Sequence, residues 1–238
     1  GDTGVVIYTN SIGGAKSNFE GGPSALAAGL TGRTPRYGYH LERHRQATLR
    51  IQLDWTPREL SDWGALGAII GRVSGNYWQV PVVDGFDRFP VSDEIKHFGA
   101  AMASFGSTAL FHLVGITPEA HSLGDVGGDR LPIAHRIGEG DIRNLKKSYA
   151  ADKHIDIVVF SAPQLSLYEL RDLAGLCQGR HFKRPLLVTT SPQVKPDSDR
   201  FGYTEAIEGA GGTVLTGMCF YQSYAREMSE ANGWRRLA

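Results

Sequence analysis

The second half of the chain alternates short apolar runs with helical patterns, and this alternation constrains the fold more than any other feature. Three apolar runs of strand length, DIVVFSA, PLLVTTS and TVLTGM, are separated by segments with helical periodicity such as LSLYELRDLAGL. Strands that alternate with helices at this spacing form βαβ units with parallel strands. We therefore predict an α/β fold with mainly parallel sheets.

The first half contains segments of the same kinds. Residues 5–9 (VVIYT) form an apolar run that predicts a buried strand, followed by a glycine-rich loop through Gly22 and a helix that starts near Pro23. Further strands and helices are expected at residues 48–54, 57–72, 92–105 and 108–116. Residues 121–140, rich in Gly, His and Asp, are expected to form a surface loop or the junction between the lobes. We predict two α/β/α lobes, residues 1–140 and 141–238, joined near 138–148.

Composition limits the classes of partner. Lys plus Arg number 25 and Asp plus Glu number 25, so no net charge attracts nucleic acid or an anionic membrane. The apolar fraction of 41% suits a globular core, and no apolar run is long enough to cross a bilayer. We expect a cytoplasmic protein with a small-molecule ligand. Its two cysteines, Cys177 and Cys219, form no CxxC motif, so any metal cluster needs ligands from elsewhere.

The loop between residues 10 and 23, NSIGGAKSNFEGGP, is the leading candidate for a ligand site. Its predicted place between a strand and a helix is where open α/β sheets bind ligands. The loop offers hydrogen-bonding groups, a cation and a carboxylate, on Asn10, Ser11, Lys16, Ser17, Asn18 and Glu20. Such a set suits a small acid that also carries a hydroxyl or an amine. The alternative is an Asn/Ser/Gly turn that merely caps a helix.

Other candidates lie near the ends of predicted strands. His112 and Glu119, in FHLVGITPEA, are either ligand-binding groups or a core histidine and a helix-start glutamate. Ser166 and Ser191 lie at the rim of a possible site, although Ser166 is equally explained as a helix N-cap. Cys219 is either a metal ligand or a buried thiol.

Two further motifs indicate other chemistry only weakly. Lys16 follows an alanine and lacks the glycine spacing of a P-loop, which counts against a nucleotide-dependent transferase. His40 and His44 lie four residues apart in HLERH and would share a metal if helical, but no third ligand is indicated, so surface histidines are the preferred interpretation.

Several strings resemble the aconitase X family of dehydratases. YTNSIGGAKSNFEGGPSALAAGLTGRTPRYGYHL is similar to the family's signature over residues 8–41. ALFHLVGITPEA, DIVVFSAPQLSLYEL and TVLTGMCFY resemble later family segments, in the same order along the chain. The resemblance departs from the family at Lys16, where many members have Arg, and at Gln164, where many have His.

The resemblance implies a fragment of an aconitase-like large domain that works with an iron–sulfur cluster, 2Fe-2S or 4Fe-4S. In such enzymes the cluster acts as a Lewis acid on the leaving hydroxyl. Cys219 matches a cluster ligand, and the loop at residues 10–23 matches a substrate-binding segment. The family's proton-abstracting serine belongs to a separate swivelling domain, so this chain alone is expected to be incomplete and to need that domain and further large-domain segments as partners.

The resulting hypothesis is a hydro-lyase component that dehydrates a small hydroxy acid. Cis-3-hydroxy-L-proline is favoured over mevalonate 5-phosphate, because a phosphorylated substrate favours clustered cations and the signature loop carries only Lys16. The rival from another class is a non-catalytic ligand-binding or assembly subunit, which the missing base and missing cluster ligands would also explain.

Overall fold

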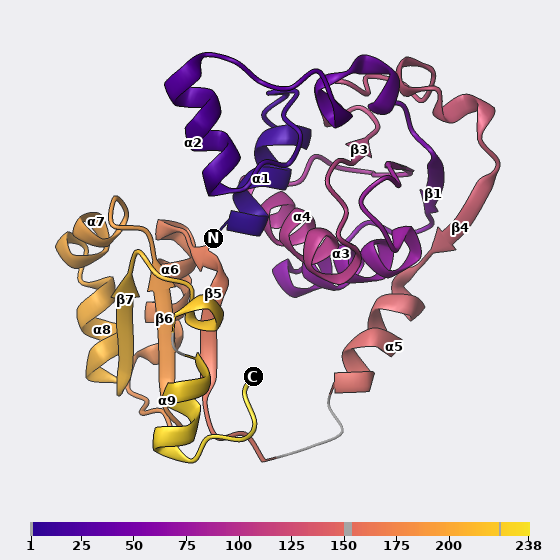
Figure 1. Cartoon of the computed structure of the whole chain (residues 1–238). Coiled ribbons are helices and arrows are strands. Elements are labelled where there is room, and N and C mark those ends of the chain that lie inside the picture. The colour runs from indigo at the N-terminus through magenta and orange to yellow at the C-terminus, as the bar shows by residue number, and fades with distance from the viewer. Residues whose placement is uncertain (1, 150–153, 224) are drawn as a thin grey trace. The chain divides into compact units, whose positions relative to one another are not determined.

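The computed structural model describes residues 2–149, 154–223 and 225–238 (Figure 1). These residues divide into two compact units. The first is Asp2–Tyr149, and the second contains the described residues from 154 onward. No helix in the described part has both the length and the apolar character needed to cross a membrane.

The first unit is built on a parallel sheet of four strands in the order β3-β2-β1-β4. The strands are β1 (Leu49–Leu53), β2 (Pro81–Asp84), β3 (His112–Leu113) and β4 (Ile133–Ile137). The parallel arrangement confirms the prediction, but β3 is much shorter than the apolar run at 108–116. The expected surface loop at 121–140 contains β4, which the sequence did not reveal because four of its five residues are exposed at the sheet edge.

Two long helices cover one face of this sheet. They are α3 (Leu60–Ser74) and α4 (Ser92–Gly106), close to their predicted positions. The core between helices and sheet contains Ile51, Trp63, Phe98 and Phe111. The helices touch where Gly67 has no side chain, because a Cβ there would lie 2.1 Å from the carbonyl oxygen of Phe98.

The opposite face is covered by irregular chain rather than by long helices. Residues 114–131 include two short 3-10 turns, η3 (Gly124–Val126) and η4 (Gly128–Arg130). Val126 packs there against Val82 of β2. The segment predicted as a solvent-facing loop therefore contributes to the core of the first unit.

The predicted strand at residues 5–9 is wrong. These residues belong to a helix, α1 (Asp2–Ser11). Ile7, Asn10 and Ser11 are fully buried, a spacing of three and four residues that fits one face of a helix, while Val5 is 59% exposed. The β-branched residues favoured a strand, but packing against α4, where Ile7 meets Gly99, overrides that preference.

The loop after α1 therefore joins two helices and does not follow a strand. The second helix, α2 (Gly22–Thr31), agrees with the prediction: Pro23 lies in its first turn and Gly32 ends it in the left-handed conformation. No residue of α2 is buried. The first unit ends with α5 (Glu139–Tyr149), which the prediction had assigned to the second lobe.

The second unit contains a parallel sheet in the order β5-β6-β7. The strands are β5 (Val158–Leu165), β6 (Leu186–Thr190) and β7 (Gly212–Thr216), as predicted. Leu186 and Val188 face one side of the sheet, whereas Leu187 faces the other, as the pleat requires.

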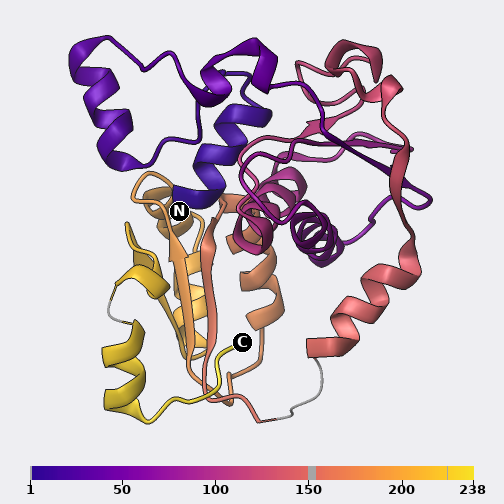
Figure 2. The ribbon, with the colours of Figure 1, turned by 45° about the vertical axis from the view of Figure 1, so that its right-hand side comes forward.

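Helices lie on both faces of this sheet. Helices α6 (Leu167–Cys177) and α8 (Tyr203–Gly209) pack on the side of Leu186 and Val188, and α9 (Ala225–Asn232) packs on the other. Figure 2 shows α9, in yellow, and α6 on opposite sides of the strands. A short helix, α7 (Lys195–Arg200), was not predicted.

Candidate functional site

Arg45 is the centre of the polar cluster that holds the signature loop in place. Its side chain is 1% exposed. Its guanidinium donates to the Asn10 side chain at 2.8 Å and to the Asn10 carbonyl at 3.0 Å. It also donates to the carbonyls of Tyr39 at 2.9 Å and Ser17 at 3.4 Å. One buried cation thus joins the end of α1, the signature loop and the turn η1 (Gly38–His40).

The same guanidinium forms a two-pronged pair with Glu119. Nε of Arg45 donates to Oε2 of Glu119 at 2.8 Å, and Nη2 donates to Oε1 at 2.5 Å. Burial alone would raise the pKa of Glu119, but the hydrogen bonds and the charge of Arg45 hold that pKa below its ordinary value. Glu119 is therefore a carboxylate, and its side chain stays 18% exposed.

Arg45 was not among the predicted site residues. It lies in the string HLERHRQA, where only the histidines drew attention. Arginine is seldom fully buried unless it is paired, so an isolated arginine in a polar string gives little sign of burial. Its acidic partner, 74 residues further along the chain, is a tertiary contact without a local pattern.

His112 is a core histidine that hydrogen-bonds to the backbone of Arg45. Its Nε2 donates to the carbonyl of Arg45 at 2.7 Å. Burial lowers the pKa of His112, and the nearby Arg45 charge lowers it further, so the ring is neutral. Its Nδ1 has no hydrogen-bond partner among the described residues. Of the two interpretations of His112, the one as a buried core histidine agrees with its position.

Asn10 and Ser11 are fully buried, and both bond to protein groups. Asn10 donates through Nδ2 to the carbonyl of Ala109 at 2.8 Å, and Ser11 accepts the backbone N–H of Phe111 at 3.1 Å. These bonds fix the end of α1 against the segment that leads into β3. As substrate contacts these two residues stay predictions.

The middle of the loop carries its charged side chains, Lys16 and Glu20. Lys16 forms an ion pair with Glu42 and remains half exposed. Glu20 pairs with His40, with 2.5 Å between Oε1 and Nε2, and accepts the N–H of Asn18 at 2.8 Å. Lys16 has a φ of 50°, a left-handed conformation that is uncommon for a residue with a side chain. The surrounding hydrogen bonds hold the loop in this strained shape.

Asn18 anchors the loop to two tyrosines. Its Oδ1 accepts the N–H of Tyr39 at 2.7 Å and the hydroxyl of Tyr77 at 2.6 Å. Burial raises the pKa of Tyr77 to about 12, so its phenol remains a hydrogen-bond donor. Ser17 contributes its carbonyl to Arg45, as described above, and its side chain is partly exposed. The structure thus brings eight of the ten predicted substrate-binding residues together in the first unit, with Ser17 and Asn18 between Lys16 and Glu20 in the loop.

The other candidates gather in the second unit at the carboxyl edge of its sheet. Ser166 directly follows β5 and caps α6, accepting the N–H of Glu169 at 3.2 Å. Ser191 directly follows β6 and accepts the N–H of Val194 at 3.2 Å. Cys219 follows β7 and precedes η5 (Phe220–Gln222). All three belong to one sheet edge, as predicted from parallel strands; Ser166 is a helix N-cap, and the Ser191 hydroxyl closes the turn that precedes α7.

Donors for a metal cluster are scarce among the described residues. No group of three or more His, Cys, Asp or Glu side chains is arranged there to hold a metal ion. Cys177 is 4% exposed, and burial raises the pKa of its thiol, whereas Cys219 is partly exposed. The described residues therefore do not form an iron–sulfur site by themselves. The spacing of His40 and His44 does not make a metal site either, since His40 pairs with Glu20 and His44 contacts Arg43.

Comparisons with known proteins agree on one family. The model of the aconitase X second domain matches residues 47–149, and that of the third domain matches residues 155–237. The phosphomevalonate dehydratase large subunit of Methanothermobacter thermautotrophicus is 40% identical over 222 residues, which cover 92% of this chain and 53% of that protein. The cis-3-hydroxy-L-proline dehydratase of Pseudomonas aeruginosa is 32% identical over 226 residues, covering 92% of this chain and 39% of that protein.

A solved structure gives the same result. The crystal structure of Thermococcus kodakaraensis aconitase X in its holo-form superposes with a TM-score of 0.79 at 34% sequence identity, over 91% of this chain and 55% of that one. The chain spans about half the length of the phosphomevalonate dehydratase large subunits that it matches. Both the sequence and the fold place this chain in the aconitase X family.

Proposed function

We propose that this chain is part of a hydro-lyase that removes water from a small hydroxy acid. The observation that carries the proposal is its membership of a family whose similar relatives are named dehydratases, with 31 to 40% identity. The buried Arg45 network supports it, because the network fixes a strained, charged loop of the kind found at functional sites.

In this proposal the first unit contributes substrate-binding groups. Lys16 is half exposed, and its present partner Glu42 is a surface carboxylate with 68% exposure. A substrate carboxylate would take the place of Glu42 beside Lys16. Glu20 and Glu119, each less than one-fifth exposed, would face a hydroxyl or ammonium group of the substrate.

The charge balance of the loop supports an amino acid as the substrate. Lys16 and Arg45 each already pair with a carboxylate, and Glu20 adds a further negative charge. A phosphate group would call for several unpaired cations. Cis-3-hydroxy-L-proline brings one carboxylate and one ammonium group, which suit Lys16 and Glu20 respectively.

Mevalonate 5-phosphate is the second candidate substrate. The observation in its favour is the 40% identity to the Methanothermobacter thermautotrophicus large subunit, against 32 and 33% for the two hydroxyproline dehydratases. Cations for its phosphate would then come from parts of the complete enzyme outside the signature loop.

Cys219 would supply one ligand of an iron–sulfur cluster. It is the more accessible of the two described thiols and lies at the sheet edge that also carries Ser166 and Ser191. The remaining cluster ligands and the proton-abstracting base would come from other segments of the complete enzyme. Iron and acid-labile sulfide, measured on the anaerobically purified assembly, should be present in the native protein and lost in Cys219→Ser.

The direct experiment incubates the complete enzyme containing this chain with each of the two substrates and detects loss of one water by mass spectrometry. Turnover of cis-3-hydroxy-L-proline, with much slower turnover of mevalonate 5-phosphate, is expected. The reverse preference would support the second candidate. Binding of a hydroxy acid without turnover of either would favour a ligand-binding subunit and contradict the dehydratase proposal.

A further inference from the structure

The connection between α6 and β6 carries a concentration of positive charge. Four of the five residues from 180 to 184 are basic: Arg180, His181, Lys183 and Arg184. All four are exposed. In the described part of the chain no carboxylate pairs with any of them, although many other exposed basic side chains there, such as Arg58, Arg171 and Arg200, have acidic partners. In a chain with 25 basic and 25 acidic residues this is a local excess of cations.

An apolar trough lies directly beside these cations. It has a volume of about 480 Å³ and is bounded by β5, the last turns of α6 and the basic connection. Its walls include two large side chains left in contact with water, Phe160 at 43% and Leu176 at 64% exposure. Among the residues that the structure describes, no acidic side chain lines it.

The trough lies on the helix-covered face of the sheet. Val158 and Phe160 lie two residues apart on β5 and share the face on which α6 packs. Helix α8 contacts α6 and β7, the strand at the other edge of the sheet. Phe160 of β5 remains 43% exposed on this face.

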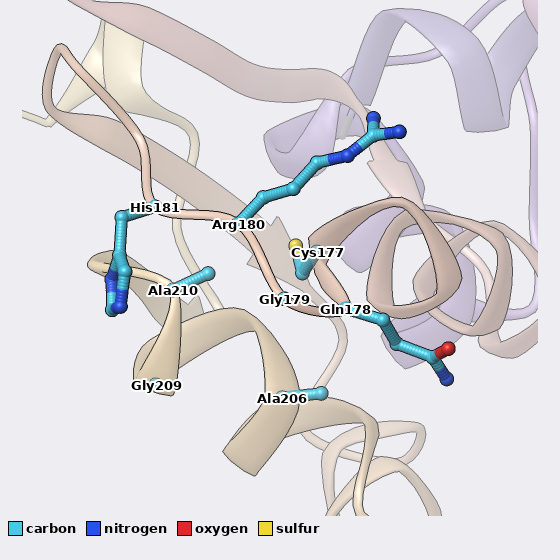
Figure 3. Close-up of a pocket in the computed structure, with 8 residues that line it drawn as sticks. All are labelled: Cys177, Gln178, Gly179, Arg180, His181, Ala206, Gly209 and Ala210. Carbon is cyan, nitrogen blue, oxygen red and sulfur yellow. The ribbon is translucent and has the colours of Figure 1, made fainter.

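A second hollow lies on the other side of the same connection (Figure 3). Its volume is about 360 Å³, and it lies between the end of α6 and the end of α8. Figure 3 shows His181 beside Gly209 and Ala210, while Arg180 extends in a different direction from the chain. The cations therefore border both hollows rather than one.

Backbone hydrogen bonds hold the basic connection in a fixed shape. The N–H of Arg180 donates to the carbonyl of Cys177 at 3.0 Å, and that of Phe182 donates to Ala210 at 2.9 Å. Val158 donates to the carbonyl of Pro185 at 3.0 Å, which ties the end of the connection to β5. The cationic side chains therefore extend from a backbone that is already ordered, so ligand binding would cost little conformational entropy of this backbone.

We propose that this trough binds an amphipathic anion, a molecule with a hydrocarbon body and a phosphate or carboxylate head. The body would lie against Phe160 and Leu176, where its burial removes apolar surface from water. The head would be held by Arg180 and its basic neighbours, since guanidinium and ammonium groups bind phosphate and carboxylate. The volume of the trough lies within the range of small-molecule sites.

This site is separate from the candidate residues of the proposed reaction. Val158 and Leu186 of the trough are the first residues of β5 and β6. Ser166 and Ser191 follow the last residues of the same strands, at the opposite edge of the sheet. The proposal therefore stands whether or not the dehydratase proposal does.

Calorimetric titration of the purified chain with octyl phosphate, kept below its micelle concentration, tests the proposal. Saturable binding of one molecule per chain is expected. Octan-1-ol and inorganic phosphate should each bind at least ten times more weakly. Octan-1-ol has the hydrocarbon body without the anionic head, and inorganic phosphate has the anionic head without the hydrocarbon body. Failure of octyl phosphate to saturate would overturn the proposal, as would binding only to phosphatidylglycerol vesicles, because a single-chain trough needs no bilayer.

Variants locate the site. The triple change Arg180→Gln, Lys183→Gln, Arg184→Gln should weaken octyl phosphate at least tenfold, and Leu176→Ser should weaken it several-fold. The control changes three exposed basic residues elsewhere: Lys147→Gln, Arg200→Gln and Arg226→Gln. Unaltered affinity in the first triple variant, or an equal loss in the control, would contradict the assignment.

Discussion

The guanidinium of Arg45, which is buried, and the carboxylate of Glu119, which is 18% exposed, form a two-pronged pair, 2.8 Å from Nε to Oε2, that joins two segments 74 residues apart. Removing one partner of such a pair leaves the other charge without compensation. Arg45→Met should therefore destabilise the protein by about 3 to 5 kcal/mol. Urea unfolding followed by tryptophan fluorescence measures this loss, because Trp55, Trp63 and Trp78 all belong to the first unit.

The matched control for Arg45 is Arg58→Met. Arg58 also pairs with a carboxylate, that of Asp87, but both side chains are more than half exposed. Water screens this pair, so its loss should cost about 1 kcal/mol or less. Equal effects of the two substitutions would contradict the structural role given to Arg45.

The attachment of the signature loop depends on a glycine. Gly38 has a φ of 56°, and a Cβ at this position would lie 2.0 Å from Oδ1 of Asn18. Gly38→Ala should therefore break the bonds from Tyr39 and Tyr77 to Asn18 and lower stability by about 2 kcal/mol or more. Gly29→Ala is the control, because nothing lies near that position in the exposed helix α2, and it should be neutral or raise stability by up to about 1 kcal/mol.

His112 should make stability depend on pH in a defined window. Burial lowers its pKa in the folded protein, so the unfolded chain binds the proton more readily. Its contribution is fully present above the ordinary value of 6.5 and is lost as the pH falls through the lowered pKa of the folded state. The expected slope is up to about 1.4 kcal/mol per pH unit.

The free energy of unfolding in urea is measured from about pH 7.5 to about pH 5, a range that includes the ordinary pKa of histidine. The native protein is compared with His112→Gln. The glutamine amide can still donate to the carbonyl of Arg45 but does not titrate in this range. A native protein whose stability falls no faster with decreasing pH than that of the variant would show that His112 is not the buried neutral group described here.

The two cysteines should differ in reactivity. Cys177 is 4% exposed, and burial raises the pKa of its thiol, whereas Cys219 is partly exposed. Reaction with dithionitrobenzoate should therefore modify one thiol per native chain, and Cys219→Ser should abolish that fast reaction. The unfolded chain should expose two reactive thiols; two fast thiols in the native protein would contradict the burial of Cys177.

The second unit was predictable from the sequence because its signals are local. Each of its three strands is an apolar run bounded by turns, and Ser166 caps α6 as expected, in a capping box that the structure completes with Glu169. The first unit was harder for two reasons. Residues 5–9 carry a strand-like composition that helix packing overrides, and β4 is an exposed edge strand without a buried alternation.

The candidate loop was found from the sequence, although for a partly wrong reason. It does not follow a strand, so the argument from the sheet edge does not apply to it, yet its polar residues do form one cluster with His112 and Glu119. Arg45 was missed because its burial depends on Glu119 and Asn10, which are distant in sequence. Contacts between residues so far apart in the sequence produce no periodic pattern from which they could be predicted.

The most direct test of the central claim is steady-state kinetics of the complete enzyme carrying Lys16→Met. If the loop binds the substrate carboxylate, KM should rise at least tenfold, Lys16→Arg should retain most of the affinity, and the exposed control Arg58→Met should behave like the native enzyme. Circular dichroism checks that each variant is folded. A Lys16→Met enzyme with native KM and kcat would contradict the assignment of this loop to substrate binding.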